Sequence, residues 1–207
     1  MRKQAMAQKN AKTGIFLKWR AFKANRRGVA AVEFALVVPI LLVLYIGTLE
    51  LSMGLTVNKR IARIASTVAD LVTQQEEVDQ QTLHGIMGVA ESIMYPYTTT
   101  NPEITIVAVD VDEDHKNNGW GKVVWSRGMD TDGTYNAGRA VGSFIRVPNR
   151  LRFDDSFLIY VTAEIKYKPV VAQFTGRDAQ GNPTGVDIDE QYWLNPRLPV
   201  EIPCKNC

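Results

Sequence analysis

The chain is poor in the residues that carry most catalytic and metal chemistry. It has two histidines and two cysteines among 207 residues. His84 and His115 fall in different predicted elements, and Cys204 and Cys207 stand together near the end of the chain. No Ser-His-Asp, Cys-His or zinc-ligand spacing can be assembled from them, and no glycine-rich phosphate loop follows a predicted strand. The sequence therefore predicts no enzyme, no catalytic residue, no cofactor and no resident metal.

Acidic residues are missing from the first 27 positions, which hold nine of the 24 Lys and Arg residues. The other 15 basic residues stand against 22 acidic ones, so the rest of the chain is acidic although the formal net charge is +2. Lys and Arg before an apolar segment are typical of a cytoplasmic flank, because they are held back during membrane insertion. A basic arm can also bind nucleic acid, but no helix-turn-helix, zinc-finger or RNA-binding pattern accompanies this one. We expect no nucleic-acid partner.

Charge is absent again across the 16 residues 34–49, and the wider run 29–57 carries only Glu33 and Glu50. At 1.5 Å rise per residue this run is long enough for a hydrocarbon layer of about 30 Å. The two glutamates would lie roughly 25 Å apart, near the two boundaries of that layer, where a carboxylate is least unfavourable. We expect a transmembrane helix over 29–57, with a local kink at Pro39. Gly47 and Gly54 would permit close approach of a neighbouring helix.

Helical periodicity continues beyond this run, which predicts one helix from about Ala30 to Val72. Residues 73–79 should break it, with Thr73 and Glu76 forming a capping box. A second amphipathic helix follows and ends at Tyr95, before Pro96. Residues 58–101 are therefore assigned to an amphipathic helical region.

From residue 102 the apolar period becomes two, and β-branched and aromatic residues dominate over 103–111, 120–127 and 156–168. The first two segments read as a hairpin. A fourth apolar run covers 169–174, a turn-rich loop covers 176–185, and an extended segment covers 187–203. The predicted fold class is α+β: a long amino-terminal transmembrane and amphipathic helix, a short second helix, and a small antiparallel sheet, in 102–207, that packs on the outer half of the first helix.

Gly28 opens the motif G-x-x-x-x-E-F, whose last two residues are Glu33 and Phe34, directly after Arg26 and Arg27. This motif resembles the type IV prepilin cleavage signature. The run VEFALVVPILLVLYIGTLELS is similar to the TadE-like family, the minor pilin or pseudopilin-like proteins of bacterial tight-adherence (Tad) pilus systems. The resemblance covers about residues 26–69.

The resemblance implies a pilin-like fold and cleavage between Gly28 and Val29 by an integral-membrane aspartic prepilin peptidase, which removes residues 1–28 as a basic cytoplasmic leader. It also implies other pilin-like subunits and inner-membrane pilus assembly proteins as partners. The protein would be a single-pass protein of the bacterial inner membrane, with its amino terminus cytoplasmic and its carboxy-terminal domain outside. The free amine of Val29 would be one helical turn from Glu33, and the pilin analogy pairs Glu33 with that amine in its own chain or in a neighbouring subunit.

Other interpretations of the same stretch stay open. In a plain signal anchor Gly28 is incidental and Glu33 snorkels to the interface. Ordinary signal peptidase cleavage after Ala65 or Ala69 fits badly, because the apolar run is too long and neither site follows it directly. The protein can also be a permanently anchored periplasmic adaptor of a secretion or pilus machine, or, less readily, an anchored enzyme.

Two clusters suggest further chemistry. Acidic residues gather near the predicted hairpin and a following turn, a composition that suggests calcium binding (Asp110, Asp112, Glu113, Asp114, Asp130, Asp132). An EF-hand loop counted from Asp110 lacks the glycine and the glutamate that such a loop needs, so solvated turns are favoured. Cys204 and Cys207 lie in the segment predicted to be exported, where an oxidising compartment favours a disulfide. A redox dithiol would normally start a helix within a larger fold.

Overall fold

The computed structural model describes residues 28–97, 101–111, 119–153, 156–169, 185–197 and 201–207. The chain divides into two compact units, Met1–Leu49 and Glu50–Cys207. The basic leader, the centre of the predicted hairpin with His115, and the loop after residue 169 lie outside the described residues. The α+β class is confirmed.

Helix α2 (Val29–Thr73) contains 45 residues and passes through Pro39, as the periodicity predicted. Its buried residues begin only at Val57 and recur every three or four positions to Thr73 (Val57, Ile61, Ile64, Ala65, Val68, Ala69, Val72, Thr73). This spacing places them on one stripe of the helix, which faces the core of the second unit. Before Val57 nearly every large apolar side chain of the helix is exposed.

The junction after α2 differs from the prediction. Helix α3 (Gln80–Met94) begins seven residues after Thr73, and its N-cap is Asp79, whose carboxylate accepts a hydrogen bond of 2.7 Å from the Thr82 amide. That hydrogen bond lowers the pKa of Asp79. The capping box at Thr73 and Glu76 is therefore wrong. Thr73 still belongs to α2, where its hydroxyl donates to the Asp70 carbonyl at 2.9 Å.

The main sheet is antiparallel and has the strand order β4-β3-β2-β6-β7, with β5 also paired to β3. Its long strands are β2 (Glu103–Val111), β3 (Trp120–Met129), β6 (Ser156–Tyr167) and β7 (Val186–Leu194). The short ones are β4 (Tyr135–Asn136) and β5 (Phe144–Arg146). The predicted hairpin is confirmed by the antiparallel β2–β3 pairing, and β7 overlaps the first half of the predicted extended segment. The two short strands, and the 3-10 turn η2 (Asn149–Leu151), were not predicted.

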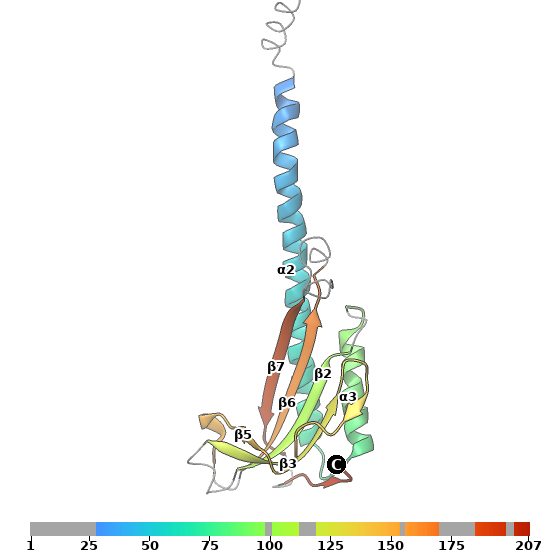
Figure 1. The fold of residues 1–207 in the computed structure, drawn as a ribbon, viewed down its shortest axis with the longest axis vertical. Helices are drawn as coiled ribbons and strands as arrows, with labels where there is room; N and C mark the ends of the chain where they lie inside the picture. The colour runs from blue at the N-terminus through green and yellow to red at the C-terminus, as the bar shows by residue number, and fades with distance from the viewer. Residues whose placement is uncertain (1–27, 98–100, 112–118, 154–155, 170–184, 198–200) are drawn as a thin grey trace, which may run out of the picture. The chain divides into compact units, whose positions relative to one another are not determined.

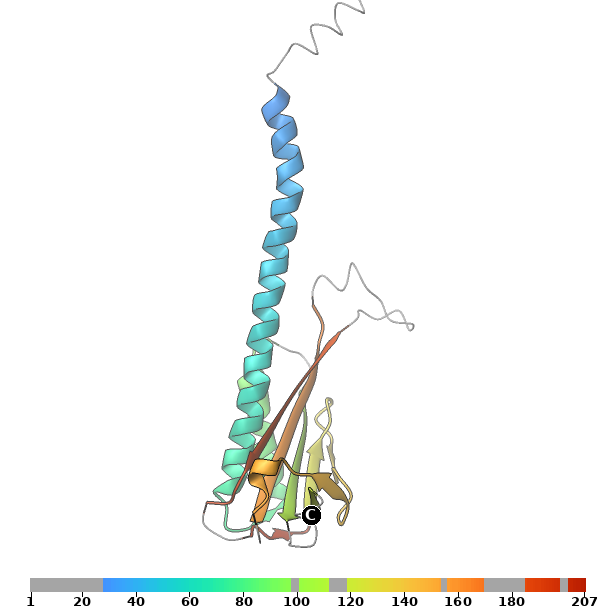
Figure 2. The ribbon, with the colours of Figure 1, turned by 90° about the vertical axis from the view of Figure 1, so that its left-hand side faces the viewer.

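Figures 1 and 2 show α3 and the second half of α2 on one face of this sheet. The main core lies between the two layers, because alternate residues of β2 and β6 join the buried stripe of α2 (Ile104, Ile106, Ala108, Phe157, Ile159, Val161, Ala163, Ile165). A smaller cluster lies on the opposite face, around Val107, Val109 and Leu158. Two-residue periodicity in the sequence therefore gives a sheet with a helix-covered face and a partly uncovered one.

Candidate functional site

The predicted scissile bond lies at the start of α2. Val29 is the first residue of the helix and is half-exposed. Gly28 precedes it and is exposed, and a Cβ built on Gly28 meets no atom within 4 Å. Nothing in the described part of the chain therefore covers the Gly28–Val29 bond, while Arg26 and Arg27 lie outside that part.

Glu33 and Phe34 follow within the next turn and a half, and both are exposed, Phe34 to 70%. No acidic residue occupies the first turn of α2, so Glu33 is the first carboxylate after the positive end of the helix. Among the described residues no ion pair or hydrogen bond involves the Glu33 side chain.

No residue is buried in the 18-residue window that makes α2 a candidate membrane span. By length and composition α2 is able to cross a membrane, and it is the one such helix in the described ranges. The core helix of a soluble protein passes the same composition test, but its apolar window is mostly buried. An exposed run of Leu, Val and Ile requires an apolar environment from outside the chain.

The outer end of this run has a contact that the sequence did not predict. The Tyr167 hydroxyl, at the end of β6, donates a hydrogen bond of 3.3 Å to the Glu50 carboxylate. Burial raises the pKa of Tyr167, and the negative charge of Glu50 raises it further. A Cβ built on Gly54 would lie 3.7 Å from the Tyr167 ring. A position near the membrane boundary therefore does not fully explain Glu50, because Tyr167 also contacts it. Gly54 faces Tyr167, on this chain's own sheet.

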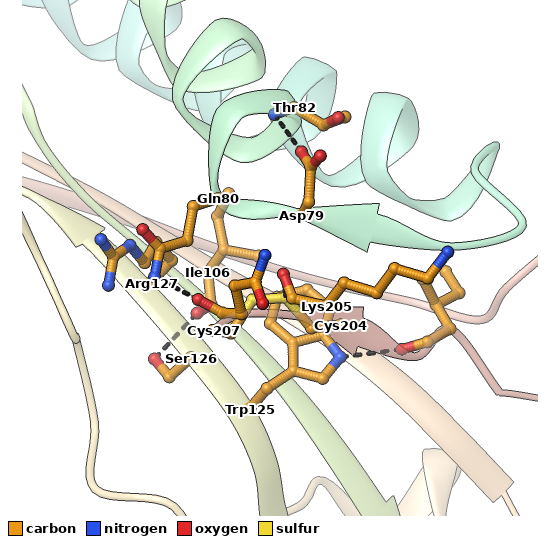
Figure 3. Close-up of a disulfide and its surroundings, with 12 residues drawn as sticks. Asp79, Gln80, Thr82, Ile106, Trp125, Ser126, Arg127, Cys204, Lys205 and Cys207 are labelled. Atoms are coloured by element: carbon orange, nitrogen blue, oxygen red, sulfur yellow. Dashed lines mark hydrogen bonds between the residues drawn. A yellow bond between two sulfur atoms is a disulfide. The ribbon is translucent and has the colours of Figure 1, made fainter.

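The two cysteines lie in the carboxy-terminal segment, residues 201–207, which is called the clasp below. Strand β8 (Cys204–Lys205) pairs in parallel with β1 (Val78–Asp79), between the two helices. The Trp125 indole donates a hydrogen bond of 2.8 Å to the Ile202 carbonyl, and Lys205 lies 2.6 Å from the Glu77 carboxylate. Figure 3 shows the disulfide between Cys204 and Cys207 beside Trp125; the Cα atoms of the two cysteines are 5.7 Å apart.

Asn206 lets the two cysteines meet. Its φ is +69°, in the left-handed region that asparagine tolerates better than most residues, and this turns the chain back between Cys204 and Cys207. Asn206 is visible in the sequence, but only the structure shows that its turn brings the two cysteines together.

The acidic turns and the histidine have local roles. The Asp132 carboxylate accepts a hydrogen bond from the Thr134 amide at 2.9 Å, which lowers the pKa of Asp132, and Asp130 accepts from the Asn136 amide group at 2.7 Å. His84 stacks on Tyr135 and accepts a long hydrogen bond of 3.4 Å from Arg127, while burial lowers its pKa. No group of three metal-ligating side chains occurs among the described residues, and positions 112–115 lie outside them.

Comparison with protein families gives a match that covers most of helix α2. Residues 28–70 match the family model described as TadE-like protein. The resemblance inferred from the sequence is therefore confirmed over the segment that contains Gly28, Glu33 and the membrane-competent part of α2. No curated protein and no solved structure matches the chain.

Proposed function

We propose that this chain, whose residues 28–70 match the TadE-like family, is a minor pilin or pseudopilin-like subunit of a tight-adherence (type IV-like) pilus, acting in pilus assembly and adhesion. The family match supports the coarser statement, a protein associated with a Tad pilus. The finer role rests on the chemistry at the start of α2. Its partners would be a prepilin peptidase, other pilin-like subunits, inner-membrane assembly proteins and the membrane itself.

One observation carries the proposal: an exposed apolar helix opens directly after Gly28 and carries its first carboxylate one turn later, at Glu33. An unpaired carboxylate in lipid is unfavourable by roughly 2.5 kcal/mol or more. Removal of residues 1–28 would create a protonated amine on Val29. This amine would lie within one helical turn of the Glu33 carboxylate and offset its negative charge. The glutamate is therefore tolerated in the helix if the bond before Val29 is cut.

Assembly would then use the exposed apolar side chains of α2, Glu33 and the Val29 amine. The apolar helix stores the subunit in the inner membrane, with the basic leader cytoplasmic and the second unit outside. When the subunit is extracted, its exposed Leu, Val and Ile side chains pack on the helices of other subunits. The pairing of Glu33 with the Val29 amine of a neighbour fixes the register of that packing.

Processing is tested by intact mass and amino-terminal sequencing of the full chain, made with and without a prepilin peptidase. We expect Val29 to become the first residue only when the peptidase is present. Gly28→Val should block the cut, because a branched side chain hinders close approach to the peptidase. Gly47→Val is the matched control: a Cβ at either glycine meets nothing within 4 Å, so neither change disturbs the fold.

The proposal fails if the chain keeps residue 1 as its terminus in both strains. It also fails if Gly28→Val and Gly47→Val are cut equally well, because the peptidase would then not recognise Gly28.

A further inference from the structure

Three carboxylates lie side by side on the sheet face that the helices leave uncovered. Glu103 of β2 stands directly opposite Glu164 of β6, and Glu164 stands opposite Asp189 of β7. All three side chains are exposed, and none takes part in an ion pair with another described residue. Like charges directly opposite one another destabilise a sheet. We call these three residues the acid row.

The acid row lines a groove of about 730 Å³ on this face. The flanking residues Ala163 and Ile165 point into the helix-side core, so Glu164 points away from α2 and α3. Arg139 is the basic residue on the groove wall. The groove is polar, open and negative, and it fits a basic surface.

A basic surface of this kind lies on the opposite side of the same unit. Lys59 and Arg63 are exposed on α2, about half a turn around the helix from the buried stripe. Together with Arg60 they line a second groove of about 550 Å³, which has no acidic residue on its wall. Arg60 is used within the chain, because it donates to the Ile93 and Tyr95 carbonyls and lies over the Tyr97 ring. Lys59 and Arg63 are here called the basic pair.

The acid row and the basic pair lie at the same level along α2. The Asn58 side chain donates a hydrogen bond of 3.0 Å to the Glu190 carboxylate. Asn58 is next to Lys59 in the sequence and Glu190 is next to Asp189. The contact therefore places the acid row and the basic pair at the same level along α2. Two copies inserted in one membrane run parallel, and each would therefore present its acid row at the height of the other's basic pair.

We propose that the acid row of one chain docks on the basic pair of a second copy. The two surfaces lie on opposite sides of the unit, so the contact is head-to-tail and leaves a free surface of each kind for the next copy. The proposal rests on the proposed function only in that both copies are membrane-inserted. It names a contact between exported units, which adds to the packing of the apolar helices.

Zero-length coupling of amines to carboxylates tests the contact in membranes of cells that produce two differently tagged full-length copies. We expect a cross-linked pair whose joined peptides contain Lys59 and either Glu164 or Asp189. Reversing the row with Glu103→Lys and Glu164→Lys should lower the yield by about tenfold or more, because like charges then meet at the contact. Combining this reversal with Lys59→Glu and Arg63→Glu in the same chain, so that every copy carries both, should restore a cross-linked pair, now through residue 164 of one copy and residue 59 or 63 of the other.

Lys166 and Asp187 provide the internal control, because their side chains lie 3.9 Å apart within one chain and should couple in every variant. The proposal is overturned if reversal of the acid row leaves the yield unchanged, if the combined reversal does not restore it, or if Lys59 couples to a different protein instead of a second copy. The uncut Gly28→Val chain should still cross-link, since both surfaces lie within the second unit. Loss of processing and loss of docking are thereby distinguished.

Discussion

Glu33 and Glu50 are the two charges on the apolar part of α2, and their surroundings differ. Glu50 accepts a hydrogen bond from Tyr167, which belongs to the same compact unit. Glu33 is exposed and has no side-chain partner among the described residues. A carboxylate on an apolar helix needs a partner or access to water. Glu50 therefore has a structural role within the chain, whereas the proposed role of Glu33 lies in contacts that the chain makes after cleavage.

Glu33→Gln keeps the shape of the side chain and removes its charge. We expect normal cleavage after Gly28 but at least about tenfold less protein in the filament fraction sheared from cells, because the Val29 amine loses its counter-charge. Glu50→Gln is the matched control, since it changes the other glutamate of the same helix and should assemble. Filament yield is measured by immunoblot. Equal yields for both variants would favour the permanently anchored adaptor.

At the scale of elements, the clasp connects segments that are distant in the sequence. Strand β8 pairs with β1, and the Val78 amide donates to the Pro203 carbonyl at 3.0 Å. The Arg197 amide also donates to the Thr73 carbonyl at 3.0 Å, at the last turn of α2. The carboxy-terminal segment thus closes the junction between the two helices, and we propose that the Cys204–Cys207 disulfide forms in the exported protein and holds this segment in place.

Cys204→Ser/Cys207→Ser should lower the stability of the second unit by about 1–2 kcal/mol, less than a typical disulfide contributes because the loop that it closes is short. This corresponds to a fall in Tm of roughly 2–6 °C for a unit of this size. Thermal melts followed by circular dichroism, with and without reductant, measure the change. Reductant should lower the Tm of the unchanged chain and leave that of the double variant as it is. Free thiols in protein isolated from the cell envelope would contradict the proposal.

At the scale of the whole molecule, exposed apolar surface and folded core belong to different parts of the chain. The large apolar residues of α2 that are exposed all lie between Val29 and Leu55. The buried stripe begins at Val57, and the main core is complete without any residue before it. The second unit therefore has the core of an independent domain, while the first needs an apolar environment.

A fragment of residues 50–207 should fold and remain in the aqueous phase after detergent phase separation, whereas the full chain should enter the detergent phase. The fragment keeps Glu50, and so it also keeps the Tyr167 contact. Phase partition by immunoblot and a cooperative thermal melt of the fragment measure the two properties. An unfolded or aggregated fragment would show that residues before Glu50 contribute to the core.

Local features of the chain were predictable from the sequence. The bounds of the two helices and of β2 followed from the apolar period. The candidate site at Gly28, Glu33 and Phe34 came from the resemblance to the prepilin cleavage signature, and it stays a prediction. These features depend on neighbours within one or two turns, so they can be read without knowing the fold. The capping box at Thr73 failed because the first helix kept that residue, and Asp79, directly before the second helix, caps it instead.

The sequence by itself determined that the chain has a membrane-competent helix with a glutamate five residues after a glycine, followed by an α+β unit. Only the tertiary structure decided that Glu50 meets Tyr167, 117 positions away. It also decided that Glu103, Glu164 and Asp189 form one row, and that Cys204 lies beside Val78. The reason is strand register: a shift of one residue turns a side chain to the other face of a sheet, and register between distant segments is set by core packing as a whole.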